Sequence, residues 1–269
     1  MADQTRQHHH YPHTHVHHHH HHSAGESHRR DWASANRNYF DDKAKAVDDI
    51  PGVREATTRI VNAILASYPA LFDSGSTSLM EFGCGTGLPG QIHSVSQADK
   101  IDVPGLISRG LYPYTKSILG VDISQGMVDH YNFKVLNEGI SPDRMKAIRV
   151  EPRGNGSELG GQQFDVIVCS MAYHHIASVE DTTRMLCSLL KPGGSLLVAD
   201  ILKDGGKRDF PEFAQQLVPH TEGFNRDEMK ALFEGAGLVQ FALTNATSAN
   251  MHGTWLQLFL ARGAKPTWA

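Results

Sequence analysis

The chain has 269 residues, of which 40% are hydrophobic, so it can bury the core of one large α/β domain with additions. Its net charge of −4 argues against general nucleic-acid binding, which depends on neutralising phosphates with Lys and Arg. No apolar run approaches the roughly 20 residues of a membrane span, and the polar N-terminus carries no signal-peptide pattern. Three cysteines give no disulfide framework and suit a reducing compartment. We therefore expect a cytoplasmic protein, with the nucleus as the alternative, and no membrane or nucleic-acid partner.

Segment 1–30 is rich in histidine, and twelve of the 18 histidines lie between His8 and His28. Such a tract can bind metal ions, although a purification tag has a similar composition. Because the segment lacks the apolar residues of a core, we expect it to be disordered. We give it no part in the mechanism and predict no metal in the active site.

The next segment, 31–76, predicts helices, because apolar residues recur at helical spacing from Trp32 to Ser67. The pattern breaks at Pro51, so a second helix is expected over 53–67. Tyr39 and Phe40 are candidates either to close over a neighbouring pocket or to anchor the core.

The most informative stretch is LMEFGCGTG, from Leu79 to Gly87. Its apolar residues predict a buried strand, and Gly83, Gly85 and Gly87 leave the following loop without bulky side chains. Glycine tolerates a positive φ and has no Cβ, so this backbone can turn tightly and lie against a ligand. A helix predicted over 87–93 would point its first amide groups at the same ligand. We interpret the stretch as a nucleotide-like cofactor site at the edge of a parallel sheet.

Two cofactor patterns fit these glycines. The spacing Gly85-x-Gly87-x-x-Gly90 satisfies the dinucleotide pattern, although its first glycine should end the strand, and here Gly83 does so. The alternative is acid-x-Gly-x-Gly-x-Gly, which begins at Glu81.

Strands alternate with helices in the remainder of the chain, which predicts a parallel sheet. Ser117–Asp122 is typical of a buried strand whose final acid can accept hydrogen bonds from two ribose hydroxyls, and Ser124 suits a helix N-cap. Leu189–Gly194 predicts a helix end and a turn. The predicted strands are 77–82, 117–122, 145–150, 164–170, 195–200, 237–244 and 254–261, and the later helices are 124–138, 179–190 and 226–235.

Four of these features, in this order, resemble the class I S-adenosylmethionine-dependent methyltransferases. They are the glycine loop, the strand-end acid in VDISQGMV, the aspartate-led strand Phe164–Ser170 and the LKPGG turn. The resemblance covers about Glu81 to Asp200. It implies an α/β fold with a Rossmann-like seven-stranded mostly parallel sheet, helices on both faces and an antiparallel last strand. It also implies that residues 31–76 form an N-terminal helical lid before a methyltransferase domain at 77–269.

The resemblance further implies S-adenosylmethionine as the cofactor and suggests its contacts. Gly83, Gly85 and Gly87 would approach its amino-acid and ribose portions, Glu81 its amino group, and Asp122 its ribose hydroxyls. Further cofactor candidates are Cys84 in the glycine loop, Ile123 and Met127 beside adenine, Glu151 at the adenine amine and Ser170 on the methyl-transfer face. A small buried side chain is the alternative account of Cys84.

Two segments depart from the compact family pattern. Gly87 and Asp122 are 35 residues apart, whereas such an acid usually follows the glycine loop by about 20 residues. Residues from about 94 to 114 therefore look inserted, either extending the first crossover helix or forming a flap near the pocket. Residues 203–224 lie where insertions in this fold commonly shape the acceptor pocket, and a surface helix with a buried apolar face is the alternative.

The catalytic candidates are His174, His175 and His220. Methyl transfer from a sulfonium is an in-line displacement with an activated leaving group, so the protein contributes mainly geometry and desolvation. A hydroxyl acceptor also needs a base, and histidine has a suitable pKa. His174 and His175 follow strand 164–170, where open α/β sheets place ligands, and His220 lies in the acceptor segment. The alternative for one of the adjacent pair is a structural hydrogen bond.

We therefore expect a methyltransferase that acts on a small organic acceptor, with O-methylation favoured and N- or C-methylation as alternatives. A protein methyltransferase, or a methyltransferase-like regulatory subunit of a protein complex, is the alternative. The sequence is compatible with a monomer and with a homo- or heterodimer.

Overall fold

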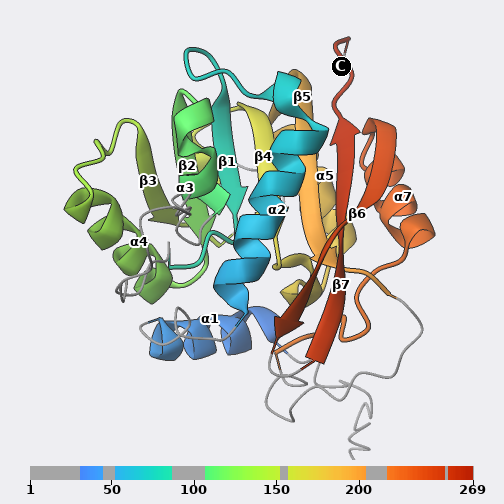
Figure 1. Ribbon diagram of the computed structural model, residues 1–269, viewed down its shortest axis with the longest axis horizontal. Helices are drawn as coiled ribbons and strands as arrows, with labels where there is room; N and C mark the ends of the chain where they lie inside the picture. Colours follow the sequence, from blue (N-terminus) through green and yellow to red (C-terminus); the bar gives the residue numbers. More distant parts are fainter. Residues whose placement is uncertain are drawn as a thin grey trace, which may run out of the picture. The chain divides into compact units, whose positions relative to one another are not determined.

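One seven-stranded sheet dominates the residues that the computed structural model describes, which are 31–44, 52–86, 107–151, 157–203, 217–251 and 254–268. Its strand order is β3-β2-β1-β4-β5-β7-β6 (Figure 1). The strands are β1 (Ser78–Phe82), β2 (Ser117–Asp122), β3 (Met145–Arg149), β4 (Phe164–Ser170), β5 (Leu190–Ile201), β6 (Val239–Met251) and β7 (Thr254–Ala264). The strands from β3 to β5 run parallel, and β7 is antiparallel to both of its neighbours.

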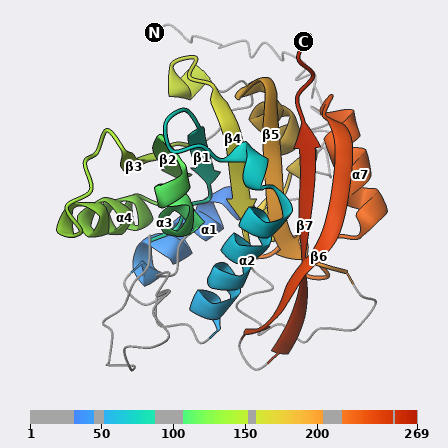
Figure 2. The same ribbon diagram turned by 45° about the horizontal axis from the view of Figure 1, so that its top comes forward.

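Helices cover both faces of this sheet. The described α-helices are α1 (Trp32–Lys43), α2 (Val53–Ser67), α3 (Ile107–Leu111), α4 (Gln125–Asn137), α5 (Val179–Ser188) and α7 (Arg226–Gly235). Apolar residues of α2, α3 and α4 pack on one face, and those of α5 and α7 pack on the other. Figure 2 shows α2 on the near side of the strands and α7 at the β6 end of the sheet.

The strands build two cores because successive side chains point to opposite faces. Leu79 and Val166 belong to the cluster under α2, α3 and α4, whereas Met80 and Ile167 belong to the cluster under α5 and α7. The same alternation directs Glu81 toward α3. The alternation of side chains along the strands therefore decides which face of the sheet a site residue occupies, as it does for the core residues.

The predicted fold is confirmed in its main features. All seven predicted strands are present, the sheet is mostly parallel, and the last strand is antiparallel. Ser124 is the predicted N-cap of α4, because its Oγ accepts a hydrogen bond from Met127 N at 3.1 Å. The helix predicted over 87–93 lies outside the described residues.

One local prediction was wrong. The turn expected at Leu189–Gly194 lies largely inside β5, which begins at Leu190 rather than at residue 195. Leu190 pairs with Phe164, and the register then shifts before Ser195 pairs with Val166. Gly193 has a φ of +80°, so the turn residues form an irregularity within the strand instead of a separate connection.

The two N-terminal helices have different roles, and both belong to the compact unit Asp31–Ala269 that contains the sheet. On α2, Ile60 and Ile64 are fully buried in the core under the sheet. On α1, Asp41 instead reaches the first turn of α4, at the carboxyl edge of the parallel strands. Only α1 therefore lies where the predicted lid would be.

No helix within the described ranges is long and apolar enough to cross a membrane.

The loop that returns to α7 depends on Gly223, which has a φ of +75°. A Cβ at this position would overlap the Ile201 carbonyl group at the end of β5. We expect Gly223→Ala to lower the free energy of unfolding by at least about 2 kcal/mol, because it adds strain and a backbone overlap. Gly235→Ala is the matched control, since a Cβ there meets nothing within 4 Å. Urea unfolding measures both variants, and equal stabilities would contradict the prediction.

Candidate active site

The glycine loop turns tightly at the carboxyl end of β1. Gly83 and Gly85 have φ values of +70° and +59°, and Gly83 N donates to Val121 O at 2.8 Å. A Cβ on Gly83 would lie 2.8 Å from the Cβ of Ala172, whereas a Cβ on Gly85 would meet nothing within 4 Å. The loop thus contacts the segment that follows β4 and leaves open space above Gly85, where a ligand can approach the backbone. The third predicted glycine, Gly87, lies outside the described residues.

Asp122 faces this loop from the end of β2. Its carboxylate accepts hydrogen bonds from Gly85 N and Ser124 N, both at 2.9 Å. Burial raises the pKa of Asp122, and the hydrogen bonds from Ser124 and Gly85 partly offset that effect. Each carboxylate oxygen has more than one acceptor site, so two ribose hydroxyls can still be bound beside the loop. The residues present therefore fit the cofactor that the resemblance implies.

Cys84 fills space between the loop and β2. The residue is buried, and a Cβ added to Gly120 would lie 2.8 Å from Cys84 Sγ. Burial raises the pKa of the Cys84 thiol, with a further contribution from Asp122. A thiol that is buried and neutral is a packing group rather than a nucleophile, which favours the structural alternative for this residue.

Glu81 is bound by α3. Its carboxylate accepts hydrogen bonds from Ser108 N, at 3.0 Å, and from the Ser108 hydroxyl. Burial raises the pKa of Glu81 to about 7, although the Ser108 hydrogen bonds act in the opposite direction. The described end of the predicted 94–114 insertion is thus a short buried helix that covers Glu81.

The predicted adenine contacts lie around the N-terminus of α4. Met127 is buried in its first turn, and Ile123 directly precedes the N-cap residue Ser124. Glu151 lies just beyond the end of β3, where it forms an ion pair of 2.8 Å with Arg37 of α1. The structure therefore brings Glu151 to the rim of this region and joins it to α1.

Ser170 ends β4 at the carboxyl edge of the parallel strands and is half-buried. The next residue, Met171, has a φ of +53°, and its N–H donates to Ala199 O at 2.8 Å. A positive φ is uncommon for a residue with a side chain and is found where the surrounding structure imposes it. The hydrogen bond to β5 and the contact between Ala172 and Gly83 provide that constraint.

His174 is paired with Asp200. Its Nδ1 lies 2.7 Å from Asp200 Oδ1, and its backbone N donates to Asp200 Oδ2 at 3.3 Å. Asp200 is fully buried at the end of β5. Burial alone would raise the pKa of Asp200, but the adjacent His174 outweighs it and holds this pKa below its usual range. The ionised carboxylate therefore accepts a hydrogen bond from His174 Nδ1. When the ring is neutral, this tautomer leaves Nε2 as a hydrogen-bond acceptor.

His175 is stacked near His174 but has a different environment. The two ring centroids are 4.3 Å apart, and the Phe40 ring of α1 lies edge-on to His175 at 5.4 Å. Burial and the neighbouring His174 lower the pKa of His175 to about 3. His175 is consequently neutral near neutral pH and shapes the site rather than carrying charge there.

His220 holds the segment that leads to α7. Its Nε2 donates to Ile176 O at 3.0 Å, and its backbone N donates to His174 O at 3.3 Å. The structure brings all three predicted histidines together, but the ring of His220 is engaged with the backbone. This geometry favours a structural role for His220.

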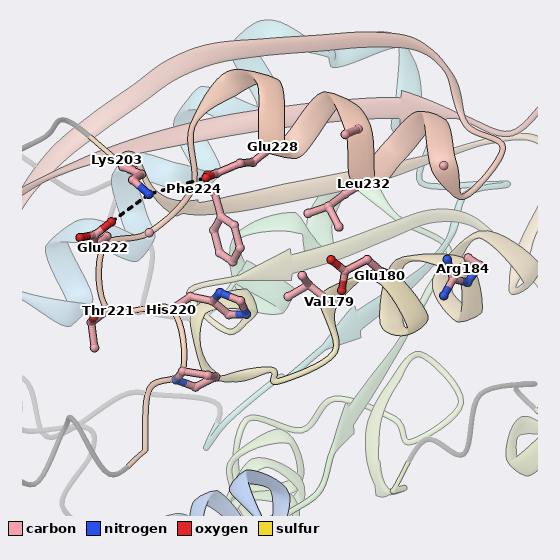
Figure 3. A pocket seen from close by; sticks show the side chains of 14 residues that line it. Val179, Glu180, Arg184, Lys203, His220, Thr221, Glu222, Phe224, Glu228 and Leu232 are labelled. Carbon is pink, nitrogen blue, oxygen red and sulfur yellow. Dashed lines mark ion pairs between the residues drawn. The ribbon is translucent and has the colours of Figure 1, made fainter. Parts of the chain in front are cut away.

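A cavity of about 610 Å³ lies between α5 and α7 and is lined by His220 (Figure 3). Val179, Phe224 and Leu232 form part of its apolar lining, and Lys203 Nζ pairs with Glu222 Oε2 at 2.8 Å. The described part of segment 203–224 therefore borders this cavity on one side and the paired histidines on the other.

Sequence reasoning missed the polar contacts of α1. Asp41 Oδ1 accepts hydrogen bonds from Ser124 Oγ at 2.6 Å and Gly126 N at 2.9 Å. Asn36 Nδ2 donates to Leu217 O at 2.9 Å, across 181 residues of sequence. The only sequence signal was helical spacing, which does not show what the polar face of a helix meets.

Comparison with known proteins agrees with this geometry. Residues 44–241 match the methyltransferase domain family. Over 181 residues the chain is 38% identical to the uncharacterized methyltransferase C1347.09 of Schizosaccharomyces pombe, a match that covers 65% of this chain and 57% of that protein. Over 224 residues it is 23% identical to 27-O-demethylrifamycin SV methyltransferase of Amycolatopsis mediterranei, covering 82% and 66% respectively. The chain thus spans less than two thirds of either relative.

A solved structure shows the same fold. The S-adenosylmethionine-dependent methyltransferase of Aquifex aeolicus has a TM-score of 0.54 and 16% identity, and the match covers 83% of this chain and 97% of that one. The sheet order, the glycine loop and the acid that ends β2 define the class I arrangement. The chain belongs to the methyltransferase domain family, and its cofactor is S-adenosylmethionine.

The raised pKa of Glu81, about 7 instead of its ordinary 4.5, makes stability depend on pH. The folded state holds this proton more tightly than the unfolded state, so stability falls as the pH rises from about 4.5 to about 7. Glu81→Gln keeps an oxygen for Ser108 and removes the titration. Between pH 4.5 and 8, we expect the stability of the variant relative to wild type to increase by about 2–3 kcal/mol.

Urea unfolding at a series of pH values measures this difference. His175 has a shift of the opposite sign, but it is present in both proteins and cancels from their difference. A difference that stays constant with pH would show that Glu81 does not titrate in this range.

Proposed function

We propose that this protein transfers a methyl group from S-adenosylmethionine to a hydroxyl group of a small organic molecule. The observation that supports this proposal is the His174–Asp200 pair at the carboxyl edge of the sheet. The pair is joined to the glycine loop through the close approach of Ala172 to Gly83, so a base and a cofactor cradle lie on one continuous surface.

Each residue has a defined task in this reaction. Bound S-adenosylmethionine supplies a methyl group on a positively charged sulfur, which departs as a neutral thioether. His174 Nε2 accepts the proton of the acceptor hydroxyl as the new oxygen–carbon bond forms, and Asp200 stabilises the resulting imidazolium through Nδ1. Asp122 and the glycine backbone orient the cofactor, and α1 excludes water from above.

Two observations support methylation of a hydroxyl: the proposed histidine base and the name of one relative. An amine, carboxylate or thiolate acceptor needs no strong base, whereas a hydroxyl benefits from a positioned histidine. The Amycolatopsis relative is named for a substrate with a free 27-O position. That name comes from a protein of 23% identity and suggests the class of acceptor rather than the molecule.

Labelled-methyl transfer into a cell extract tests the proposed function. We expect label in the small-molecule fraction, in a product whose methyl group is bound to oxygen. Label confined to protein would instead favour the protein methyltransferase alternative. No transfer, together with no calorimetric binding of S-adenosylmethionine, would favour a regulatory subunit.

The proposed base predicts a kinetic defect without a binding defect. We expect His174→Gln to lower kcat by about 10²–10⁴-fold, because a positioned base contributes about that factor. Asp200→Asn should lower kcat by at least about tenfold, since an amide can donate to Nδ1 and favour the wrong tautomer. His130→Gln on α4 is the control and should keep wild-type kcat. Unchanged kcat in His174→Gln, with cofactor affinity intact, would exclude His174 as the base.

The proposed contact between Asp122 and the ribose predicts a defect in cofactor binding. We expect Asp122→Ala to weaken binding of S-adenosylmethionine by about 1–3 kcal/mol, the scale for stranded hydrogen-bonding groups. Isothermal titration calorimetry measures the affinity, with the exposed Asp143→Ala as the control. Equal affinities for the two variants would remove Asp122 from the cofactor site.

A further inference from the structure

The backbone carbonyl of Leu217 joins α1 to the segment that follows β4. It accepts a hydrogen bond from Asn36 Nδ2 at 2.9 Å and lies 3.2 Å from His175 Nδ1. Because a carbonyl oxygen only accepts, Nδ1 of His175 carries the proton. Asn36 and His175 therefore donate to the same oxygen, and their side chains lie next to each other.

The side-chain amide of Asn36 has a fixed orientation. Nδ2 donates to Trp32 O and to Leu217 O, each at 2.9 Å, so both of its hydrogens are used. Rotating the amide by 180° would place its oxygen against two carbonyl oxygens. The orientation is thus determined by the neighbours of Asn36.

This orientation leaves Asn36 Oδ1 buried without a hydrogen-bond donor. Within the described ranges, the other buried unpaired side-chain atoms belong to Arg109 and Tyr131 and can all donate. Asn36 Oδ1 is the one among them that can only accept. A buried orphan acceptor is rare in proteins and calls for a physical explanation.

Two more acceptors face the same region without a donor. His175 is neutral and protonated on Nδ1, so its Nε2 has a lone pair. In the neutral form of His174, whose Nδ1–H is bonded to Asp200, Nε2 likewise has a lone pair. Neither Nε2 has a partner among the described residues, and neither belongs to the fully buried unpaired atoms. Both rings keep some exposed surface: the His174 side chain is 8% exposed, and His175 is half-buried.

The contacts that hold α1 determine how an incoming molecule could reach Asn36. Phe40 lies one turn after Asn36 on the same face of α1 and contacts the His175 ring edge-on. On its other side, α1 is held by polar contacts, including the Arg37–Glu151 pair, whose side chains are 23% and 42% exposed. Asp41 holds the same helix through Ser124 Oγ and Gly126 N. A donor therefore reaches Oδ1 only when α1 shifts outward and these partly exposed contacts break.

We propose that Asn36 is an acceptor-binding residue whose Oδ1 receives a hydrogen bond from a second O–H or N–H group beside the hydroxyl that is methylated. The inference rests on the proposed function and names its substrate class. The reacting hydroxyl gives its proton to His174 Nε2, while the neighbouring donor is shared by Asn36 Oδ1 and His175 Nε2. A vicinal dihydroxy arene or a hydroxyamide supplies hydrogen bonds to all three acceptor atoms, which are Asn36 Oδ1, His174 Nε2 and His175 Nε2. An isolated alcohol leaves two of them unpaired, so the site discriminates against it.

The test compares two asparagines of the same helix. Asn36→Leu removes the buried oxygen, and Asn38→Leu makes the same chemical change at an exposed position of α1. The acceptor is the unmethylated precursor of the labelled product that the wild-type full-length protein forms in an extract. We expect Asn36→Leu to raise the KM for this precursor about tenfold or more, with the affinity for S-adenosylmethionine unchanged. Asn38→Leu should stay within twofold of wild type in both quantities.

The labelled product itself gives a second readout that requires no variant. Its exchangeable hydrogens, counted by mass spectrometry in deuterated solvent, should include an O–H or N–H hydrogen on the group vicinal to the methylated oxygen. A product without such a hydrogen, or equal KM values for wild type and Asn36→Leu, would overturn the inference while leaving the methyltransferase intact. Absence of any labelled product from wild type would overturn the proposed function and this inference with it.

Discussion

The buried carboxylate of Asp200 is the constraint on which the carboxyl edge of the parallel strands depends. It is fully enclosed at the end of β5, and it is bonded by the His174 ring and by the backbone N–H groups of His174 and Ile201. A charge in such a place is tolerated only where hydrogen bonds and an opposite charge compensate its desolvation. Those bonds fix the segment after β4, which in turn contacts the glycine loop and receives the hydrogen bond from His220 N.

Buried groups near this edge differ in whether their neutral or their charged form is favoured. Burial keeps His175 neutral and raises the pKa of Glu81, while Asp200 stays ionised because His174 lies beside it. The difference arises from partners rather than from burial, which all three residues share. Glu81 is hydrogen-bonded by the neutral groups of Ser108 and lies near the Asp122 carboxylate, which also raises its pKa, whereas Asp200 has an imidazole that can take up charge.

The sequence predicts the sheet well because its evidence is local. Apolar runs ending in Gly83 or Asp122 mark strands and their carboxyl ends, and the Ser124 cap follows from one side chain and its neighbours. The extent of β5 was wrong because Leu190 pairs with Phe164 of β4, and Gly193 and Gly194 form backbone hydrogen bonds with Lys265 just beyond β7, despite the turn residues. Pairing of that kind joins residues that are distant in the chain, and local composition does not contain it.

The residues of the candidate site also divide into those that local sequence predicts and those that it does not. His174 and His175 could be found because the end of a parallel strand is a known place for ligands. The roles of Asn36, Arg37 and Asp41 could not, because each depends on a partner more than 80 residues away. The shared family region spans 44–241, and α1 ends at Lys43. The glycine loop, Asp122 and the paired histidines are therefore on a different piece of chain from α1, so substitutions among the twelve residues of α1 leave that piece of sequence unchanged.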